Sequence, residues 1–250
     1  MKQFDHTVIL ITGAGAGIGR AAALRFAAHG AQVVVTCRRA EPLRALAESH
    51  ANISYIVADA ADPASAPATI ASVIDRFGRL DVLVNNAGAG AILPLADASA
   101  QQIAHIFAVN VFGPSLLATA ALPHLKATRG SIVNVSSTFG HKAAAALSHY
   151  AASKAALEHM TRCWALELAA DGVRVNAVAA GPTETDFLVE RMGLSNAQAE
   201  AVKADERARI PLGRRGTPDE VAHWIVELAS NAGAWITGQT VTVDGGLDAT

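Results

Sequence analysis

The stretch TVILITGAGAGIG at residues 7–19 decides the fold of this chain. Its first half, Thr7–Thr12, is a short apolar run typical of a parallel strand that is buried on both faces. The second half is rich in glycine and leads directly into a segment with helical periodicity. Glycine lets the backbone turn tightly and lets a pyrophosphate approach the amides, and the helix N-terminus offers oriented N–H groups. A glycine-rich string alone could be a simple turn, but between a strand and a helix it predicts a dinucleotide site.

The same alternation of short apolar runs and helical patterns continues along the whole chain. Strands are expected at Thr7–Thr12, Gln32–Thr36, Ile53–Ala58, Val82–Val84, Ser131–Val135, Val173–Val178 and Gln239–Val243. Helices are expected at Ile18–His29, Pro42–Ser49, Ala64–Phe77, Gln101–Leu125, Ala151–Ala169 and Pro218–Ala229. This order predicts an α/β fold, a single Rossmann-like doubly wound domain over residues 1–250 with a seven-stranded parallel sheet and helices on both faces.

Residues 182–215, between the last two expected strands, are polar and longer than a simple connection needs to be. We expect a substrate lid there, although a surface excursion without function is the alternative.

The composition excludes several classes of protein. A net charge of −2 gives no reason to expect nucleic acid or an anionic membrane as a partner. The N-terminus shows no signal-peptide pattern, and no apolar run approaches the ~20 residues that span a bilayer, so we expect a cytoplasmic protein. Cys37 and Cys163 show no metal-ligand spacing, and reduced thiols without a metal are expected.

The spacing of the glycines carries a resemblance to a known family. The common fingerprint G-x-G-x-x-G fails, because Ile18 stands at the position of its last glycine. The pattern T-G-x-x-x-G-x-G fits instead, through Thr12, Gly13, Gly17 and Gly19. This pattern resembles that of the short-chain dehydrogenase/reductase family, in its branch of about 250 residues, and the likeness extends over essentially the whole chain.

Three residues are candidates for catalysis. Ser137 follows the fifth expected strand, Tyr150 comes thirteen residues later, and Lys154 lies one helical turn beyond it, on the same face. A phenol with a pKa of about 10 is a poor base, and lowering that pKa to about 7 requires about 4 kcal/mol, much of which a nearby ammonium can supply. The spacing of Tyr150 and Lys154 alone does not indicate catalysis. It does so only together with the other motifs, in the order in which they follow one another along the chain.

The resemblance implies that Ser137, Tyr150 and Lys154 carry catalysis while hydride passes directly between the nicotinamide and the substrate carbon. It places Asn110 as a fourth member, which holds a water in a proton relay from Lys154. Asn110 could also bond to backbone within a kinked helix. Of the nearby histidines, His149 is expected to face away from the site and His141 to be solvated.

The end of the second expected strand indicates which nicotinamide cofactor binds. An NAD site normally has a carboxylate here for the ribose 2′-hydroxyl, but this chain has Cys37. Arg38 and Arg39 could pair with a 2′-phosphate, so NADP(H) is expected and NAD(H) is not excluded. The alternative is a pair of solvated arginines.

The resemblance implies further cofactor contacts. Asp59 would bond the adenine amino group. In the Asn-Asn-Ala-Gly string at 85–88 the first residues would support the sheet, and Asn86, Ala87 and Gly88 would line the adenosine and its ribose. Thr183 and Thr185 would bond the nicotinamide carboxamide and phosphate. A turn in the string and helix caps at Asp59 and the threonines are the alternatives. Where relatives usually have Pro-Gly, this chain has Ala180 before Gly181. The cofactor-binding set is Thr12, Gly13, Gly15, Gly17, Ile18, Gly19, Arg38, Arg39, Asp59, Ala60, Asn86, Ala87, Gly88, Tyr150, Lys154, Gly181, Thr183 and Thr185.

The sequence therefore predicts an NADP(H)-dependent oxidoreductase that interconverts a carbonyl and an alcohol. Apolar stretches at 139–147 and 187–194 suggest a hydrophobic or mixed small-molecule substrate. One alternative is a 3-oxoacyl-thioester (acyl-carrier-protein) reductase, which needs a basic docking patch near the site, where Lys126 and Arg129 offer charge. The other is a non-catalytic NAD(P)-binding sensor. The family resemblance and alanine-rich helices predict a homotetramer.

Overall fold

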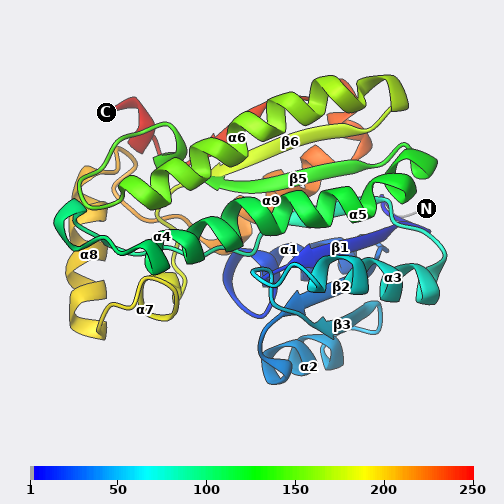
Figure 1. The fold of residues 1–250 in the computed structure, drawn as a ribbon, viewed down its shortest axis with the longest axis horizontal. Coiled ribbons are helices and arrows are strands. Elements are labelled where there is room, and N and C mark those ends of the chain that lie inside the picture. Colours follow the sequence, from blue (N-terminus) through cyan, green and yellow to red (C-terminus); the bar gives the residue numbers. More distant parts are fainter. Residues whose placement is uncertain (1–2) are drawn as a thin grey trace.

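One parallel sheet of seven strands organises residues 3–250, the part of the chain that the computed structural model describes (Figure 1). Its strand order is β3-β2-β1-β4-β5-β6-β7. The strands are β1 (Val8–Thr12), β2 (Gln32–Cys37), β3 (Ile53–Val57), β4 (Val82–Asn85), β5 (Ser131–Ser137), β6 (Arg174–Ala180) and β7 (Thr240–Val243). The order reverses direction between β1 and β4, and in such sheets ligands bind beside the strand ends at that point.

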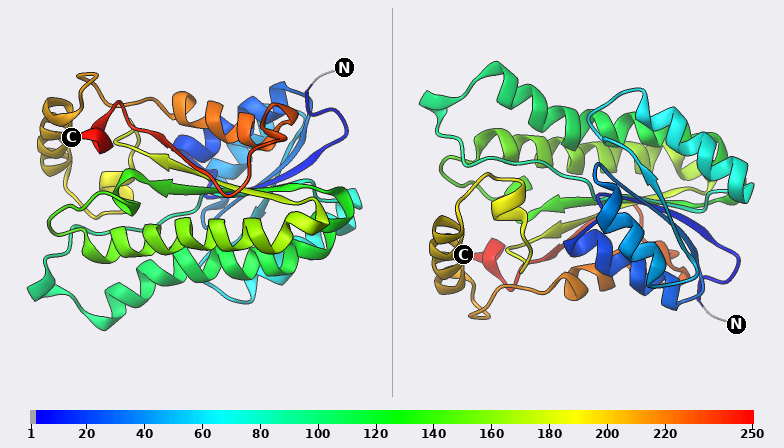
Figure 2. Two further views of the ribbon diagram at one scale, coloured as in Figure 1. Left: turned by 90° about the horizontal axis from the view of Figure 1, so that it is seen from above. Right: turned by 90° about the horizontal axis from the view of Figure 1, so that it is seen from below.

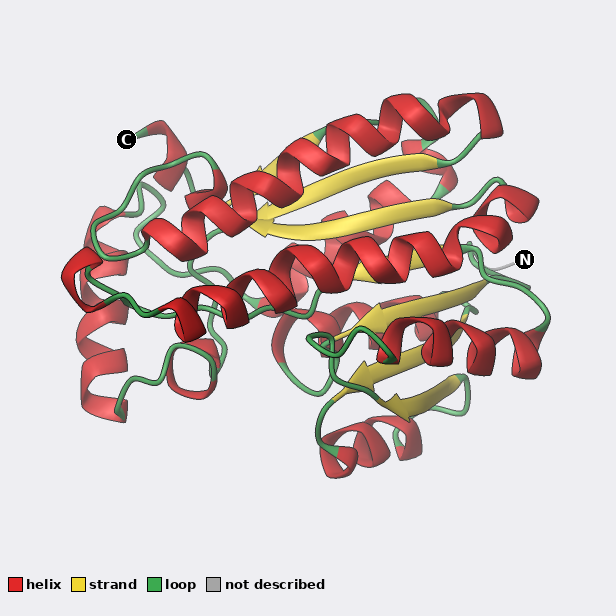
Figure 3. Ribbon diagram, viewed as in Figure 1, coloured by secondary structure: helices red, strands yellow, loops and turns green. Residues whose placement is uncertain are grey.

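Helices cover both faces of the sheet, as Figures 2 and 3 show. They are α1 (Gly17–Ala28), α2 (Ala40–Glu48), α3 (Ser65–Phe77), α4 (Ala100–Phe107), α5 (Gly113–Thr128), α6 (Ser148–Leu168), α7 (Phe187–Glu190), α8 (Asn196–Arg209) and α9 (Pro218–Ala229). One core cluster joins the sheet to α1, α2 and α9, and a second joins it to α3, α5 and α6. Because β1 is buried along its whole length, its sequence is an unbroken apolar run rather than an alternating one.

The expected fold class is confirmed, and the strand ends differ by one or two residues. Strands β5 and β6 each end two residues later than expected, and β5 continues to Ser137 rather than stopping at Val135. The pairing with β6 continues to the same point, Ser137 opposite Ala180. The candidate serine therefore lies on the sheet itself and not in a loop after it.

The single long helix expected at Gln101–Leu125 is interrupted. Between α4 and α5 the chain forms a π-helical turn, Ala108–Phe112, which contains Asn110. Pro114 has no N–H to donate to the carbonyl of Asn110 four residues earlier, so the regular helical ladder cannot continue there. Such π-helical turns are frequent at functional sites.

The expectation about membrane spans is wrong in one respect. The stretch Ala100–Thr128 is long and apolar enough to cross a bilayer by length and composition. Packing accounts for part of this apolar character, because Leu117, Ala121 and Leu125 of α5 are buried in the second core cluster against the sheet and α3. Of its apolar 18-residue window, 39% is buried, and one such helix is weak evidence for a membrane span.

Candidate active site

A cleft with a volume of about 310 Å³ lies at the carboxyl ends of the strands. It brings together most of the residues that the sequence predicts for the site: Gly13, Gly15, Gly17, Ile18, Arg38, Arg39, Asp59, Ala60, Asn86, Ala87, Gly88, Ser137, Tyr150, Lys154, Gly181, Thr183 and Thr185. Three others, Thr12, Gly19 and Asn110, are not in its lining. Their hydrogen bonds and close contacts show that they hold the lining residues in place.

Thr12 and Asn86 join the loops that follow β1 and β4. The backbone N–H groups of Asn86 and Ala87 donate to Oγ1 of Thr12 at 3.1 and 3.0 Å. In return, Nδ2 of Asn86 donates to the carbonyls of Thr12 and Gly13 at 2.8 and 3.2 Å. Gly19 leaves the room for this, because a Cβ there would lie 2.4 Å from Nδ2 of Asn86. The glycine loop and the Asn-Asn-Ala-Gly loop are therefore one rigid unit.

Asn110 extends this unit to helix α6. Its Oδ1 accepts the backbone N–H of Ala89 at 2.9 Å, and its Nδ2 donates to the carbonyl of Ala89 at 2.8 Å and to Oγ of Ser153 at 2.9 Å. The residue is fully buried. The bond to backbone that the sequence left open is thus present, and the side chain ties the loop after β4 to the helix that carries Tyr150.

Ser137, Tyr150 and Lys154 lie together in the cleft. All three are almost fully buried, and the phenol of Tyr150 interacts with the hydroxyl of Ser137. The ammonium of Lys154 donates to the carbonyl of Val135 at 2.8 Å and lies 6.0 Å from the centre of the Tyr150 ring. Ser136, the neighbour that could be confused with Ser137, donates its hydroxyl to Glu158 instead.

The pKa of Tyr150 shifts in the direction opposite to the one expected from the sequence. Burial raises the pKa of Tyr150 above its ordinary value of 10.0, and the hydrogen bond with Ser137 opposes this only in part. Lys154 does not lower this pKa towards 7, and its ammonium donates to the carbonyl of Val135. Burial lowers the pKa of Lys154 to about 8, so the lysine stays mostly protonated at neutral pH.

Glu158 is a buried carboxylate that the sequence motifs did not identify. It lies one helical turn after Lys154, and its negative charge raises the pKa of that lysine against the effect of burial. It accepts the hydroxyl of Ser136 at 2.7 Å and contacts Nδ1 of His141 at 3.2 Å. His141 is exposed, as expected, and its Nε2 also contacts Asp248 at 3.2 Å. A glutamate one helical turn after Lys154, on the helix that carries Tyr150, is the signal that could have pointed to it.

The two arginines after β2 both line the cleft, in accordance with the sequence prediction. They differ in their partners. Nη2 of Arg39 donates to both carboxylate oxygens of Glu190 in α7, at 2.9 and 3.1 Å, whereas Arg38 forms no ion pair with any residue in 3–250. The sequence predicted either an Arg39 that pairs with a 2′-phosphate or a solvated Arg39. It did not predict the ion pair with Glu190.

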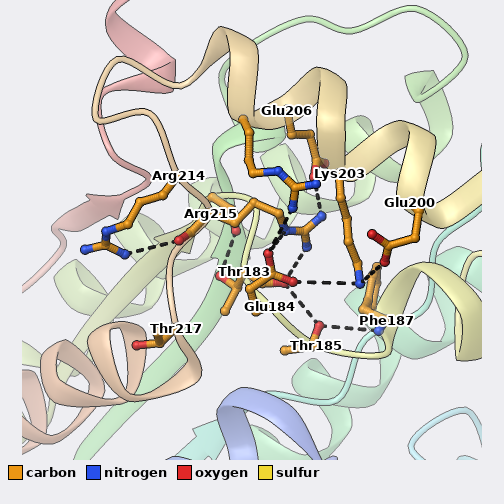
Figure 4. Close-up of polar contacts among 12 residues, drawn as sticks. Thr183, Glu184, Thr185, Phe187, Glu200, Lys203, Glu206, Arg214, Arg215 and Thr217 are labelled. Carbon is orange, nitrogen blue, oxygen red and sulfur yellow. Dashed lines mark hydrogen bonds and ion pairs between the residues drawn. The ribbon is translucent and has the colours of Figure 1, made fainter.

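Helices α7 and α8 occupy residues 182–215 and border the cleft. Figure 4 shows how α8 is attached: the buried Arg215 pairs with Glu206 of α8 and donates to the carbonyl of Thr183. Lys203 of α8 lies 3.8 Å from Glu184, which follows Thr183. The segment is therefore joined by buried charges to the loop after β6. Glu206, Arg215 and His105 also line the cleft, and no sequence motif had marked them.

The loop after β6 is held firmly although Ala180 replaces the usual proline. Ala180 pairs with Val243 of β7, and Gly181 donates its N–H to the carbonyl of Val243 at 3.0 Å. Thr183 donates its hydroxyl to the carbonyl of Gly181 at 2.9 Å, and Oγ1 of Thr185 accepts the N–H of Phe187 at 3.3 Å.

Of the first apolar stretch expected to contact substrate, only a part lines the cleft. Phe139 lines the cleft, but residues 143–147 do not. The carbonyl of Ala146 instead accepts the N–H of Leu93 at 2.7 Å, which draws this stretch against the loop after β4. From the second stretch, Phe187, Leu188 and Met192 line the cleft.

Asp59 also makes a contact expected of a cap. Its Oδ1 accepts the N–H of Ala61 at 3.0 Å, so the local turn after β3 uses one of the carboxylate oxygens. The residue lines the cleft all the same, beside Ala60.

The charges expected to form a docking patch lie elsewhere. Lys126 is in the last turn of α5, at the end of the sheet opposite the cleft, and Arg129 is the cap residue of the same helix. Lys126 is moreover paired with Asp171 at 2.8 Å. Helix α5 starts at the carboxyl edge and runs back to the start of β5, so its last turn cannot reach the mouth of the cleft.

Comparisons with known proteins agree with this geometry. Residues 13–248 match the family model described as enoyl-(acyl carrier protein) reductase. The chain is 38% identical over 250 residues to 3-oxoacyl-[acyl-carrier-protein] reductase of Thermotoga maritima, covering 98% of this chain and 99% of that protein. It is 34% identical over 249 residues to meso-2,3-butanediol dehydrogenase of Serratia marcescens, covering 99% and 96%.

The comparison with solved structures also finds a similar short-chain dehydrogenase/reductase. A short-chain dehydrogenase/reductase of unknown function from Caenorhabditis elegans, determined with cofactor, has a TM-score of 0.91 and 32% sequence identity. The match covers 99% of this chain and 97% of that chain.

The substitution Thr12→Val tests the junction between the two loops. Valine keeps the shape but removes the acceptor for the N–H groups of Asn86 and Ala87, which costs about 1–3 kcal/mol of unfolding free energy. Binding of a nicotinamide dinucleotide, measured by calorimetry, should weaken in parallel. As a control, Thr119→Val removes an exposed hydroxyl that only donates within α5, and should change stability by less than about 0.5 kcal/mol. Unchanged stability and binding in Thr12→Val would contradict the role assigned to the junction.

Proposed function

Because this chain belongs to the short-chain dehydrogenase/reductase family, we propose that it is an NADP(H)-dependent oxidoreductase in which Tyr150 exchanges a proton with the substrate. Family membership by itself makes the chain an NAD(P)-dependent enzyme acting on CH–OH groups. The observation that carries the proposal is the presence of Ser137, Tyr150 and Lys154 in the same cleft as the glycine loop.

The cleft residues fit a dinucleotide. Gly17 has a positive φ of 55°, and a Cβ at Gly15 would lie 2.9 Å from Sγ of Cys37, so neither position accommodates a side chain. Ala16, the N-cap of α1, makes no capping side-chain hydrogen bond, which leaves N–H groups of the first helical turn for a pyrophosphate. When bound, NADP(H) supplies or accepts hydride at C4 of its nicotinamide.

Side chains of the protein donate and accept the proton. In the direction of carbonyl reduction the phenol of Tyr150 donates its proton to the substrate oxygen, and in alcohol oxidation the phenolate accepts it. Ser137 orients the same oxygen through its hydroxyl. Lys154 holds a positive charge nearby, and the burial of all three residues strengthens these interactions by excluding water.

Asn110 has two roles in this proposal. Its side chain positions the loop after β4 through Ala89. Pro114 cannot donate to its backbone carbonyl, which supports the proposed role of Asn110 in holding a relay water.

The preference for NADP(H) rests on the end of β2. The position that carries a carboxylate in NAD sites is Cys37, whose thiol donates to the carbonyl of Arg39 at 3.0 Å. Arg38 and Arg39 line the cleft beside it and provide guanidinium groups for a 2′-phosphate. We propose these two residues as the 2′-phosphate site.

Further features of the sequence prediction enter as parts of the same proposal. We propose that residues 1–250 form one catalytic domain in the cytoplasm, that residues 182–215 form its substrate lid, and that the chain assembles as a homotetramer. Exposed apolar side chains on the helical stretch around Phe112 and Leu116 support association through these helices. Phe187, Leu188 and Met192 give the cleft an apolar wall, which favours a hydrophobic or mixed small-molecule substrate.

Reduction of a 3-oxoacyl thioester is the second candidate. It is supported by the 38% identity with the Thermotoga maritima reductase over nearly the whole of both chains. The position of Lys126 and Arg129, far from the mouth of the cleft, removes the docking patch proposed for a carrier protein. A sensor without turnover is disfavoured by the intact set of candidate catalytic residues.

The cofactor preference is measured as the ratio of kcat/KM for NADPH to that for NADH, with a carbonyl substrate found in a panel of ketones, sugars, quinones and 3-oxoacyl thioesters. We expect a ratio above one, because the two guanidinium groups of the proposed 2′-phosphate site line the cleft. A ratio below one would overturn the NADP(H) assignment without affecting the proposed chemistry.

The role of Tyr150 is tested with Tyr150→Phe. This variant keeps the ring that packs against Phe187 at 6.2 Å but lacks the proton. Turnover should fall by a factor of at least about 100, the usual contribution of a general acid, while the Kd for NADPH stays within about twofold. Retained turnover would contradict the assignment.

The two directions of the reaction should depend differently on pH. Because burial keeps the pKa of Tyr150 above 10.0, the phenol is protonated throughout the neutral range, and kcat/KM for carbonyl reduction should be flat between about pH 6 and 8. Alcohol oxidation needs the phenolate, so its kcat/KM should rise about tenfold per pH unit. The rise should become less steep above about pH 8, where Lys154 loses its charge. A reduction rate that falls steadily from pH 6 to 8 would show that Tyr150 titrates in that range and would contradict the expectation.

A further inference from the structure

An ion pair joins the two walls of the cleft. Arg39 directly precedes α2, on the wall formed by the end of β2, and Glu190 is the last residue of α7, in the proposed lid. Nη2 of Arg39 donates to Oε1 and Oε2 of Glu190 at 2.9 and 3.1 Å. Both residues line the cleft, so the pair connects the proposed 2′-phosphate site to the lid.

This contact differs in kind from the attachment of α8. Helix α8 is held through Arg215 and Glu206, whose side chains are 3% and 10% exposed (Figure 4). The side chains of Arg39 and Glu190 are 57% and 33% exposed. An ion pair exposed to water contributes little net free energy. The guanidinium of Arg39 can therefore exchange one anionic partner for another.

Carboxylates and phosphates compete for the same guanidinium group. Arginine pairs with either through parallel N–H···O bonds, and Glu190 occupies Nη2 of Arg39 with both of its oxygens. Around α7, the cleft is lined by Asp186 and Glu190 against Arg191, which leaves an excess of one negative charge there. This charge opposes a phosphate dianion, whereas an uncharged ribose 2′-hydroxyl can leave the ion pair intact.

We propose that Glu190 is a specificity-determining residue that competes with the 2′-phosphate of NADP(H) for Arg39 and so reduces the preference over NAD(H). The inference rests on the proposed function, because it takes Arg38 and Arg39 as the 2′-phosphate site. NADP(H) must open the ion pair, while NAD(H) binds with the pair closed. Arg38, which forms no ion pair among residues 3–250, is the guanidinium free to meet the phosphate first.

The variant Glu190→Gln removes the competing charge while nearly keeping the shape of the side chain. The ratio of kcat/KM for NADPH to that for NADH should rise about 2- to 5-fold, as expected for loss of one exposed ion pair. Most of the change should come from NADPH. The matched control is Glu200→Gln in α8, which removes the same charge from the lid but from a residue paired with Lys203 at 2.8 Å. The control should leave the ratio unchanged.

Two further measurements isolate the interaction. In an Arg39→Gln background, Glu190→Gln should no longer change the ratio, because the shared guanidinium is gone. Calorimetric titration of Glu190→Gln should show tighter binding of 2′,5′-ADP and unchanged binding of 5′-AMP, a readout that needs no turnover.

The outcomes separate this inference from the proposed function. A wild-type ratio of kcat/KM for NADPH to that for NADH below one overturns the NADP(H) assignment. The inference is then still tested by the change in this ratio that Glu190→Gln causes. A lower ratio in the variant would show that Glu190 orients Arg39 for the phosphate, and an unchanged ratio would show no competition. Either result overturns the inference.

Discussion

The cleft depends on the hydrogen bonds that join the loops after β1 and β4 through Thr12 and Asn86. These strands are neighbours in the sheet, but their ladder ends with the strands, and the N–H groups beyond it still need acceptors. The hydroxyl of Thr12 accepts two of them. Asn110 then links the loop after β4 to Ser153 on α6, the helix that carries Tyr150. The glycine loop and the proposed acid are therefore positioned by one continuous set of hydrogen bonds rather than by separate elements.

Burial has opposite effects on the two ionisable groups of this helix. It favours the neutral form of each, so it raises the pKa of Tyr150 and lowers that of Lys154. The carboxylate of Glu158 opposes the effect on Lys154, and the lysine remains charged at neutral pH. The protein alone therefore presents a protonated phenol beside a charged lysine. This arrangement suits proton donation, and a phenolate requires further positive charge in the complex.

The sequence predicts those parts of the structure that depend on neighbours along the chain. Apolar runs fix the seven strands, and glycine spacing fixes the loop after β1, because both follow from local backbone chemistry. A kink at Asn110 was only an alternative, because helical periodicity does not register a single widened π-helical turn, although Pro114 is a local cause. The contact of His141 with Glu158 was missed because it joins residues on different elements. The residue types in such a pair are ordinary at each position, and only the fold brings them together.

The cofactor preference, too, depends on contacts between residues that lie far apart in the sequence. A motif describes one wall of the cleft, and the absence of a carboxylate at Cys37 indicates a phosphate site on that wall. Specificity, however, is a difference between two binding free energies, and it includes every charge that faces the 2′-position. Glu190 brings a carboxylate to Arg39 from a segment 151 residues away. The negative charge that is missing at the end of β2 is thus supplied across the cleft from α7, in the proposed lid. A motif limited to the strand end would therefore overstate the preference for NADP(H), by the amount that the ion pair withholds from the phosphate.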